Sequence, residues 1–171
     1  MKELGLGTDL DEEEALRHYR SAAGRGCVEA AYNLGRLQIF TKTFYNDFNL
    51  GRETLHKAAK MGSGDAYNLL GCIAYKGFKT KQDHQEAREC FLQAERLGNA
   101  AAQNNLAWLY QHGYGVPADL GKAVHYYSES AAQGYSSAQC NLGYLYYHGL
   151  GVEKNIPRAF ELFGQAVDAE N

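Results

Sequence analysis

The sequence predicts an all-α fold made of repeated helix-turn-helix units, and three observations carry this prediction. The first is an unbroken internal period of 36 residues. The second is the spacing of apolar residues within each period, which follows the face of an α-helix. The third is a composition of two prolines and nineteen glycines without the alternation that is typical of strands. Helices separated by glycine-containing turns explain all three.

Four series of small and apolar residues carry the period. No insertion interrupts any of them, and all four keep one register over the chain. The members of the series are Gly26, Gly62, Gly98 and Gly134; Ala30, Ala66, Ala102 and Ala138; Ala15, Gly51, Ala87, Ala123 and Ala159; and Tyr19, Leu55, Phe91, Tyr127 and Phe163.

The N-terminal residues 1–26 are predicted to be half a repeat, a turn followed by a second helix. Gly5, Gly7, Asp11 and Ala15 stand in the register of Gly113, Gly115, Asp119 and Ala123. The acidic residues 11–14 then lie at a helix start, where negative charge is favourable. Four complete repeats follow in one continuous solenoid domain, at residues 27–62, 63–98, 99–134 and 135–171.

The repeat at 99–134 shows the unit most clearly. A first helix is predicted over residues 101–113 and a second over 119–133, each with an apolar stripe at helical spacing. Between them, GYGVPAD supplies turn glycines, a proline and an acidic residue suited to a helix start. Gly134 stands at the position of a C-terminal cap.

Small residues also recur inside the first helices, at Gly35, Gly71, Ala107 and Gly143. Glycine in a helix interior costs ~1 kcal/mol relative to alanine. Its recurrence in one register therefore predicts close packing between the two helices of a repeat.

The segments AAYNLGRL, AQCNLGYLYYHGLGV and AAQNNLAWLYQHGYGVPADLGKAVHYYSESAAQG resemble the Sel1-like repeat, a relative of the tetratricopeptide repeat. The similarity covers nearly the whole chain and is strongest over residues 99–170, whereas TKTFYNDFN at 41–49 replaces the glycine-containing turn. The resemblance implies a right-handed α-α superhelix whose first helices line the concave face. Proteins built this way commonly serve as adaptors for other macromolecules.

With that geometry, aromatic and amide side chains of the first helices point into the concave groove. Rings supply buried area, and amides bind both donors and acceptors of a peptide backbone. The alternative is that the asparagines satisfy neighbouring backbone groups while the tyrosines pack between repeats. The patch of Trp108 and Tyr144 favours binding. The residues predicted to bind a partner are Tyr32, Arg36, Asn68, Tyr75, Asn104, Trp108, Gln111, Asn141, Tyr144 and Tyr147.

Several functional classes lack support in the sequence. No H-E-x-x-H, G-x-S-x-G or S-x-x-K motif occurs, so we expect no catalytic residues and no cofactor. The cysteines fall in different registers without C-x-x-C spacing, and we expect no metal site. The net charge is -3 with scattered basic residues, which argues against nucleic acid as a partner. No apolar stretch is long enough to insert into a membrane.

The sequence therefore predicts a non-catalytic protein-protein interaction scaffold that binds a peptide or partner protein. One alternative is a β-lactam-binding or hydrolysing enzyme of the cysteine-rich Sel1-like type, although its paired cysteines are missing here. Another is a structural spacer that self-associates through uncapped ends. Neither end carries a polar cap, which predicts an internal part of a longer array. Unpaired cysteines favour a reducing compartment such as the cytoplasm, while the ER lumen and the periplasm stay open for a longer parent protein.

Overall fold

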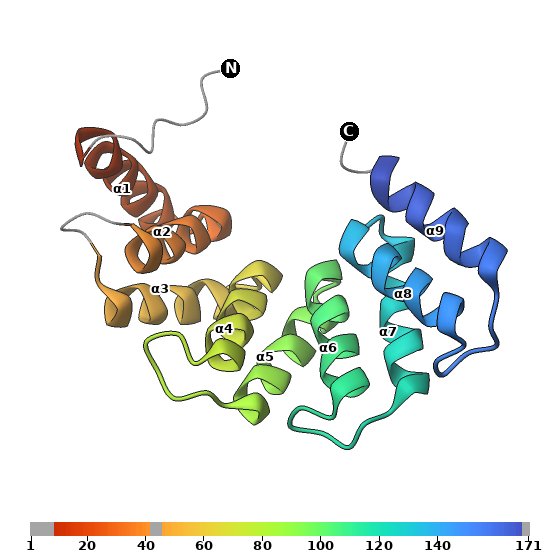
Figure 1. The fold of residues 1–171 in the computed structure, drawn as a ribbon. Coiled ribbons are helices and arrows are strands. Elements are labelled where there is room, and N and C mark those ends of the chain that lie inside the picture. The colour runs from red at the N-terminus through yellow and green to blue at the C-terminus, as the bar shows by residue number, and fades with distance from the viewer. Residues whose placement is uncertain (1–8, 42–45, 169–171) are drawn as a thin grey trace. The chain divides into compact units, whose positions relative to one another are not determined.

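The computed structural model describes residues 9–41 and 46–168, with side chains from residue 13 onward (Figure 1). Over these ranges the chain forms nine α-helices and no strand, which confirms the all-α prediction. Gly5, Gly7 and part of the segment 41–49, which replaces the glycine-containing turn of the other repeats, lie outside the described residues. The helices are α1 (Asp9–Gly24), α2 (Val28–Phe40), α3 (Phe48–Lys60), α4 (Gly64–Lys76), α5 (His84–Arg96), α6 (Ala100–His112), α7 (Leu120–Ala132), α8 (Ser136–His148) and α9 (Ile156–Asp168).

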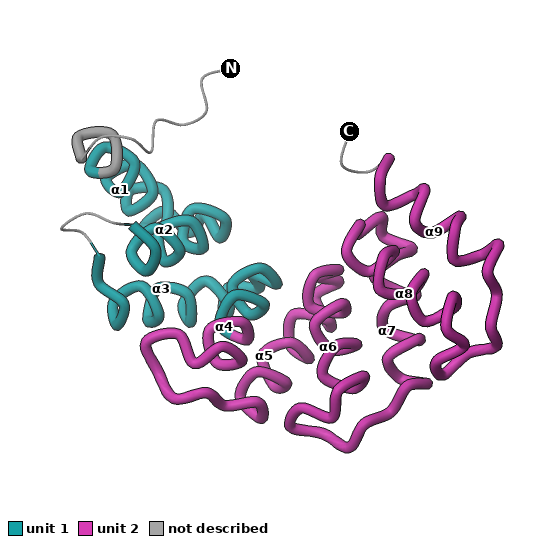
Figure 2. The backbone as a smooth tube through the Cα atoms, viewed as in Figure 1, with its two compact units in different colours: residues 1–70 teal, residues 71–171 magenta. Residues whose placement is uncertain are grey.

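The chain divides into two compact units, residues 1–70 and residues 71–171, and the boundary falls inside α4 (Figure 2). In the first unit α1 packs against α2, and α2 packs against α3. In the second unit each helix from α5 to α9 packs against the next, and α6 also contacts α8. Consecutive helices therefore pair as the helix-turn-helix prediction requires. We call α2, α4, α6 and α8 the first helices, and the others the second helices.

The second helices α3, α5, α7 and α9 begin at capping residues that keep the period, Asp47, Asp83, Asp119 and Asn155. Each side chain accepts a hydrogen bond from a backbone N–H two or three residues ahead, at 2.9 to 3.0 Å. Each capping residue also donates its own backbone N–H to a carbonyl near the end of the preceding first helix, at 2.8 to 2.9 Å. Each capping residue thus starts a second helix and fixes its distance from the first helix of the same repeat.

The turns of the last two complete repeats need glycine for two reasons. Gly115 and Gly151 have φ of 69°, a left-handed conformation that residues with a Cβ rarely adopt. A Cβ on Gly115 would lie 2.9 Å from the Cβ of His84, and one on Gly151 would lie 2.6 Å from that of Leu120. Each glycine therefore lets the turn approach the second helix of the preceding repeat.

The predicted close packing at the small helical residues is present. A Cβ on Gly71 would lie 2.5 Å from Cε1 of Phe91, and one on Gly143 would lie 2.6 Å from Cε1 of Phe163. The aromatic ring thus rests on the glycine backbone, and its burial offsets the low helix propensity.

The core of the second unit is a cluster of aromatic, leucine and alanine side chains from α6 to α9. The buried members of the cluster are Ala107, Tyr110, Ala123, Tyr127, Ala131, Ala138, Leu142, Leu145 and Leu162.

Among the described residues, no helix is long and apolar enough to cross a membrane.

Candidate functional site

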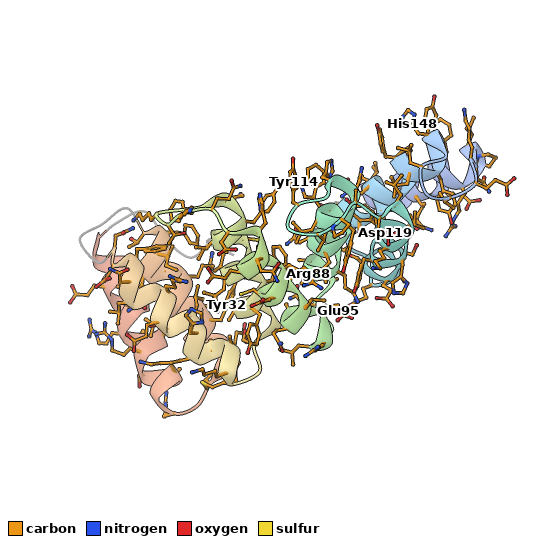
Figure 3. The ribbon with its side chains drawn as sticks, turned by 90° about the horizontal axis from the view of Figure 1, so that it is seen from below. Tyr32, Arg88, Glu95, Tyr114, Asp119 and His148 are labelled. Carbon is orange, nitrogen blue, oxygen red and sulfur yellow. The ribbon has the colours of Figure 1, made fainter. Side chains whose placement is uncertain are left out.

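The residues predicted to bind a partner divide between the two units. Tyr32, Arg36 and Asn68 belong to the first unit, where Tyr32 lies on α2 (Figure 3). The others belong to the second unit, where Tyr75 lies near the end of α4 and the rest lie on α6 and α8, and we call the surface that they form the α6–α8 face. Its predicted members are Tyr75, Asn104, Trp108, Gln111, Asn141, Tyr144 and Tyr147.

A pocket of about 310 Å³ opens on the α6–α8 face. Its walls come from the end of α4, from α5 and from α6, and we call it the tryptophan pocket. It brings together three of the residues predicted to bind a partner, Tyr75, Asn104 and Trp108, with four residues outside that set. The lining residues are Cys72, Tyr75, Lys76, Phe91, Asn104, Asn105 and Trp108.

Trp108 is fixed in place although it remains 38% exposed. Its indole Nε1 donates to the hydroxyl of Tyr75 at 2.9 Å, which ties α6 to the end of α4. The centroid of the His112 ring lies 3.9 Å from that of Trp108, and Nδ1 of His112 lies 3.0 Å from the Trp108 carbonyl oxygen. The indole therefore presents an exposed apolar surface in a conformation that its neighbours hold.

Beside the pocket, Tyr114 joins two histidines and Tyr75 in an aromatic cluster. Tyr114 lies in the turn after α6 (Figure 3) and stacks on His84 with 5.2 Å between ring centroids, and on His112 with 5.6 Å. Tyr75 lies 5.3 Å from His84. The sequence prediction missed His84 and Tyr114 because it considered only the first helices. The positive φ values of Gly113 and Gly115 fix the turn that carries Tyr114.

Amide side chains on this face connect neighbouring repeats. Asn141 donates from Nδ2 to Oδ1 of Asn104 at 2.9 Å, and Asn105 donates to the sulfur of Cys72 at 3.6 Å. Within one repeat, the side-chain carbonyl of Gln111 accepts from the hydroxyl of the buried Tyr127 at 3.0 Å. These amides bond to other side chains of the solenoid, whereas the alternative interpretation expected the asparagines to satisfy backbone groups. Asn104 also lines the pocket, where its amide nitrogen can act as a donor.

A second group of rings lies on α8 and α9. Tyr144 is 49% exposed and lies 4.4 Å from the ring of His148, which Figure 3 labels near the end of α8. Tyr147 is 41% exposed and meets His148 at 5.0 Å and Phe160 at 6.5 Å. Tyr144 stands one period after Trp108, so adjacent repeats both present an exposed ring at this position.

The charge distribution separates α6 and α8 from the second helices α5, α7 and α9. α6 and α8 contain no Asp, Glu, Lys or Arg, whereas α5, α7 and α9 each contain at least two such residues. Lys76 is the charged residue among those that line the pocket. Burial raises the pKa of the Cys72 thiol, with weaker opposing effects of Lys76 and Asn105. Cys72 is therefore a neutral wall of the pocket.

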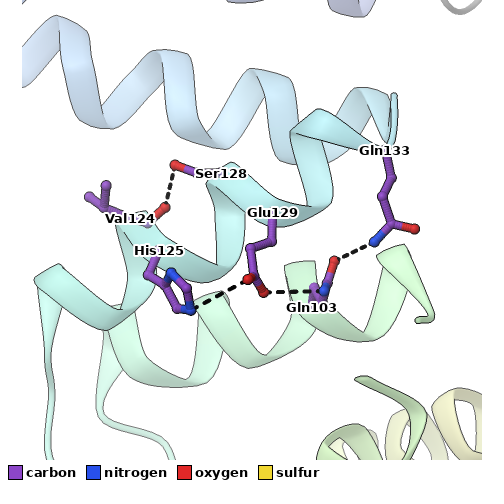
Figure 4. A network of polar contacts seen from close by, with 6 residues as sticks. All are labelled: Gln103, Val124, His125, Ser128, Glu129 and Gln133. Atoms are coloured by element: carbon purple, nitrogen blue, oxygen red, sulfur yellow. Dashed lines mark hydrogen bonds and ion pairs between the residues drawn. The ribbon is translucent and has the colours of Figure 1, made fainter. Parts of the chain in front are cut away.

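The charged groups of α7 instead form polar contacts with α6 (Figure 4). Gln103 donates to Glu129 at 3.2 Å and accepts from Gln133 at 2.7 Å, and His125 lies 3.7 Å from Glu129. This network aligns the two helices of one repeat. It gives no sign of a reactive group.

Metal-ligating side chains do not cluster in the part of the chain that the structure describes: no group of three His, Cys, Asp or Glu residues could hold an ion there. Cys27, Cys72, Cys90 and Cys140 form no disulfide in the described part of the chain. Of these, Cys72 lines the pocket.

Comparisons with known proteins agree with this fold. The family model described as the Sel1 repeat matches residues 1–27, 28–63, 64–99, 100–135 and 136–171. No curated protein resembles the chain closely enough to count as a match.

Three solved structures illustrate the similarity. A Sel1 repeat protein from Oxalobacter formigenes is 30% identical, with a TM-score of 0.87 over 96% of this chain and 67% of its own. A protective antigen with an SLR fold, present in uropathogenic Escherichia coli strains, is 27% identical, with a TM-score of 0.80 over 91% of this chain. This chain spans 33% of that antigen. The cysteine rich protein B of Helicobacter pylori is 25% identical, with a TM-score of 0.59 over 76% of this chain and 93% of its own.

Proposed function

The chain belongs to the Sel1 repeat family, and from that premise we propose that it is a non-catalytic scaffold that binds an extended segment of a partner protein on its α6–α8 face. Sel1-repeat proteins generally mediate protein-protein interactions, and their fold is typically a non-catalytic scaffold. The observation that carries the proposal for this face is Trp108, held in one conformation at the tryptophan pocket while more than a third of it is exposed.

Exposed aromatic rings on the face favour protein binding over a purely structural role. Trp108, Tyr144 and Tyr147 are all more than a third exposed, although such rings would gain free energy from burial. Tryptophan and tyrosine are enriched among the residues that dominate binding energies. Since Tyr75 and His112 already fix the indole, the Trp108 side chain loses little conformational entropy when a partner binds.

Amide donors between the rings suit an extended peptide. A peptide in extended conformation presents unpaired carbonyl groups along its length, and each needs a donor once it is buried. Asn104 lies on α6 at the pocket, and its carbonyl is already bonded to Asn141. Its amide nitrogen is therefore the group that we assign to the partner's backbone.

The test is affinity purification of the full chain and two variants, Trp108→Ala and Asn104→Ala, followed by titration of the captured partner. We expect Trp108→Ala to weaken binding roughly tenfold or more, because truncation of a central aromatic anchor commonly costs that much. Asn104→Ala should weaken it less.

The matched control is Leu97→Ala. Leu97 is also an exposed apolar residue, 48% exposed, but it follows α5 and lies outside the pocket lining. The circular dichroism spectrum of each variant checks that the helices are retained. Undiminished affinity of both Trp108→Ala and Asn104→Ala would remove the partner from this face.

A further inference from the structure

We propose that the tryptophan pocket is an anchor subsite that accepts one bulky apolar side chain of the partner segment, with an acidic residue beside that anchor facing Lys76. This inference rests on the proposed function and deepens it, since it states the chemistry of the bound segment. The geometry of the pocket, a comparison between repeats and the charge of the face each support it.

The floor and walls of the pocket are largely apolar. The floor is the ring of Phe91, which is 2% exposed and rests on the backbone of Gly71. Trp108 and Tyr75 form a wall that their hydrogen bond of 2.9 Å holds together. Binding pockets commonly measure about 300 to 1,000 Å³. At about 310 Å³, this pocket suits one large side chain with its flanking backbone.

The next repeat shows why the space is open here. One period after Phe91 stands Tyr127, whose hydroxyl extends from the ring to Gln111 at 3.0 Å. Gln111 itself stands one period after Tyr75. Phe91 has no hydroxyl, so the corresponding contact with Tyr75 is missing, and the Tyr75 hydroxyl accepts from Trp108 instead. The absent hydroxyl leaves room beyond Cζ, at the edge of the Phe91 ring.

Charge near the pocket favours an anchor with an acidic neighbour. Lys76 is an exposed cation at the end of α4, and none of the residues that line the pocket is acidic. Cys72 and the two asparagines are neutral, so they do not offset this charge. A carboxylate next to the buried side chain complements Lys76, whereas a lysine there is repelled.

The chain contains its own reporter for the test, because Trp108 is its one tryptophan. The probes are blocked hexapeptides of sequence Gly-Ser-Phe-Asp-Gly-Ser, with alanine replacing the phenylalanine in one and lysine replacing the aspartate in another. We expect the Phe-Asp peptide to change the Trp108 emission in a saturable way, with a Kd of about a millimolar. The alanine peptide should bind roughly tenfold more weakly or worse, and the lysine peptide a few times more weakly.

Two variants locate this binding in the tryptophan pocket. Phe91→Tyr restores the hydroxyl that Tyr127 carries one period later, and should reduce binding of the Phe-Asp peptide roughly tenfold by filling the space. Phe163→Tyr adds the same hydroxyl in the last repeat, outside the pocket lining, and should leave binding unchanged. Lys76→Glu should reverse the preference between the aspartate and lysine peptides.

The outcomes separate this inference from the proposed function. Equal binding of the phenylalanine and alanine peptides, or no saturable change in emission, overturns the anchor subsite. So does a Phe91→Tyr variant that binds as well as the unaltered chain. If partner capture still depends on Trp108 in those cases, the scaffold function stands without the anchor. Loss of that dependence with peptide binding intact instead contradicts the scaffold function.

Discussion

Lys79 has a left-handed backbone conformation, and glycine stands at the equivalent positions of the next two repeats. Its φ is 54°, and the residues one and two periods later are Gly115 and Gly151. In the left-handed region a residue with a Cβ is strained by ~1–2 kcal/mol, and glycine is not. Glycine loses more conformational entropy on folding, however, and this offsets ~0.5–1 kcal/mol of its advantage.

We therefore expect Lys79→Gly to raise the free energy of unfolding by about 0.5–1 kcal/mol. Urea titration followed by circular dichroism measures it. Gly115→Ala is the reverse control and should destabilise, because the new Cβ meets His84 at 2.9 Å in addition to the strained φ. A stability of Lys79→Gly equal to or below that of the unaltered chain would contradict the strain argument.

The cap at Asp119 makes a pH-dependent contribution to stability. The backbone N–H of Lys122, followed by the Lys122 ammonium, holds the pKa of Asp119 below its ordinary value of 3.8. A lowered folded-state pKa stabilises the protein above the unfolded-state value, and this contribution is lost as pH falls through the folded-state value. The carboxylate is therefore fully effective at neutral pH and lost in acid.

Asp119→Asn keeps a capping oxygen but removes the titration. We expect the variant to melt below the unaltered chain at neutral pH, and the gap in Tm to close as the pH falls below 3.8. Asn155→Asp, at the same place in the following repeat, should show the opposite change. Thermal melts over a pH series provide the measurement. A constant gap in Tm at every pH would show that the charge contributes nothing.

At the scale of the element, packing between α8 and α9 depends on a glycine. We expect Gly143→Leu to lower the free energy of unfolding by about 1–3 kcal/mol, because the added side chain must displace the Phe163 ring. Gly164 is a helical glycine in α9, and no atom lies within 4 Å of the place that a Cβ would take, so Gly164→Ala should stabilise by up to ~1 kcal/mol. Differential scanning calorimetry compares the two. An unchanged Tm for Gly143→Leu would refute the close-packing argument.

The helices themselves were predictable because the period and the caps agree. The first and second helices expected at 101–113 and 119–133 are observed at Ala100–His112 and Leu120–Ala132. The start of α1 is less well predicted, since Asp11 holds the capping register and yet α1 already includes Asp9. Local capping signals fix a helix end only when the preceding residues cannot continue the helix.

The candidate site was predictable only in part. The register places Tyr75, Asn104 and Trp108 on one surface, and they do line one pocket. It does not specify rotamers, so neither the Trp108–Tyr75 hydrogen bond nor the bond from Tyr127 to Gln111 could be derived. His84 and Tyr114 come from other parts of the repeat, and only tertiary packing brings them together beside the pocket, where His84 meets Tyr75.

At the scale of the whole molecule, the net charge of -3 says little about the proposed binding surface. The charged residues stand largely on second helices and turns, while α6 and α8 carry none. We expect partner affinity to change less than about threefold between about 0.05 and 0.5 M salt, because screening acts on few ionic contacts. Titration of the captured partner at several salt concentrations measures this. A steep fall in affinity would instead place a network of ion pairs in the interface.

The period also shapes how energy is distributed along the chain. Hydrogen bonds across the α6–α8 face join neighbouring repeats, as between Asn141 and Asn104 or between Asn105 and Cys72. In such arrays stability is close to a sum of contributions from each repeat and from its neighbours. A substitution in one repeat is then felt mainly by that repeat and those beside it.

The double role of the capping residues has an evolutionary consequence. Asp83, Asp119 and Asn155 each start a helix and measure its distance from the preceding one, so the alignment of a repeat is encoded within the repeat. Duplication or loss of a 36-residue block would carry this alignment along intact. Genes for such proteins can therefore change length by recombination in whole blocks without loss of this alignment.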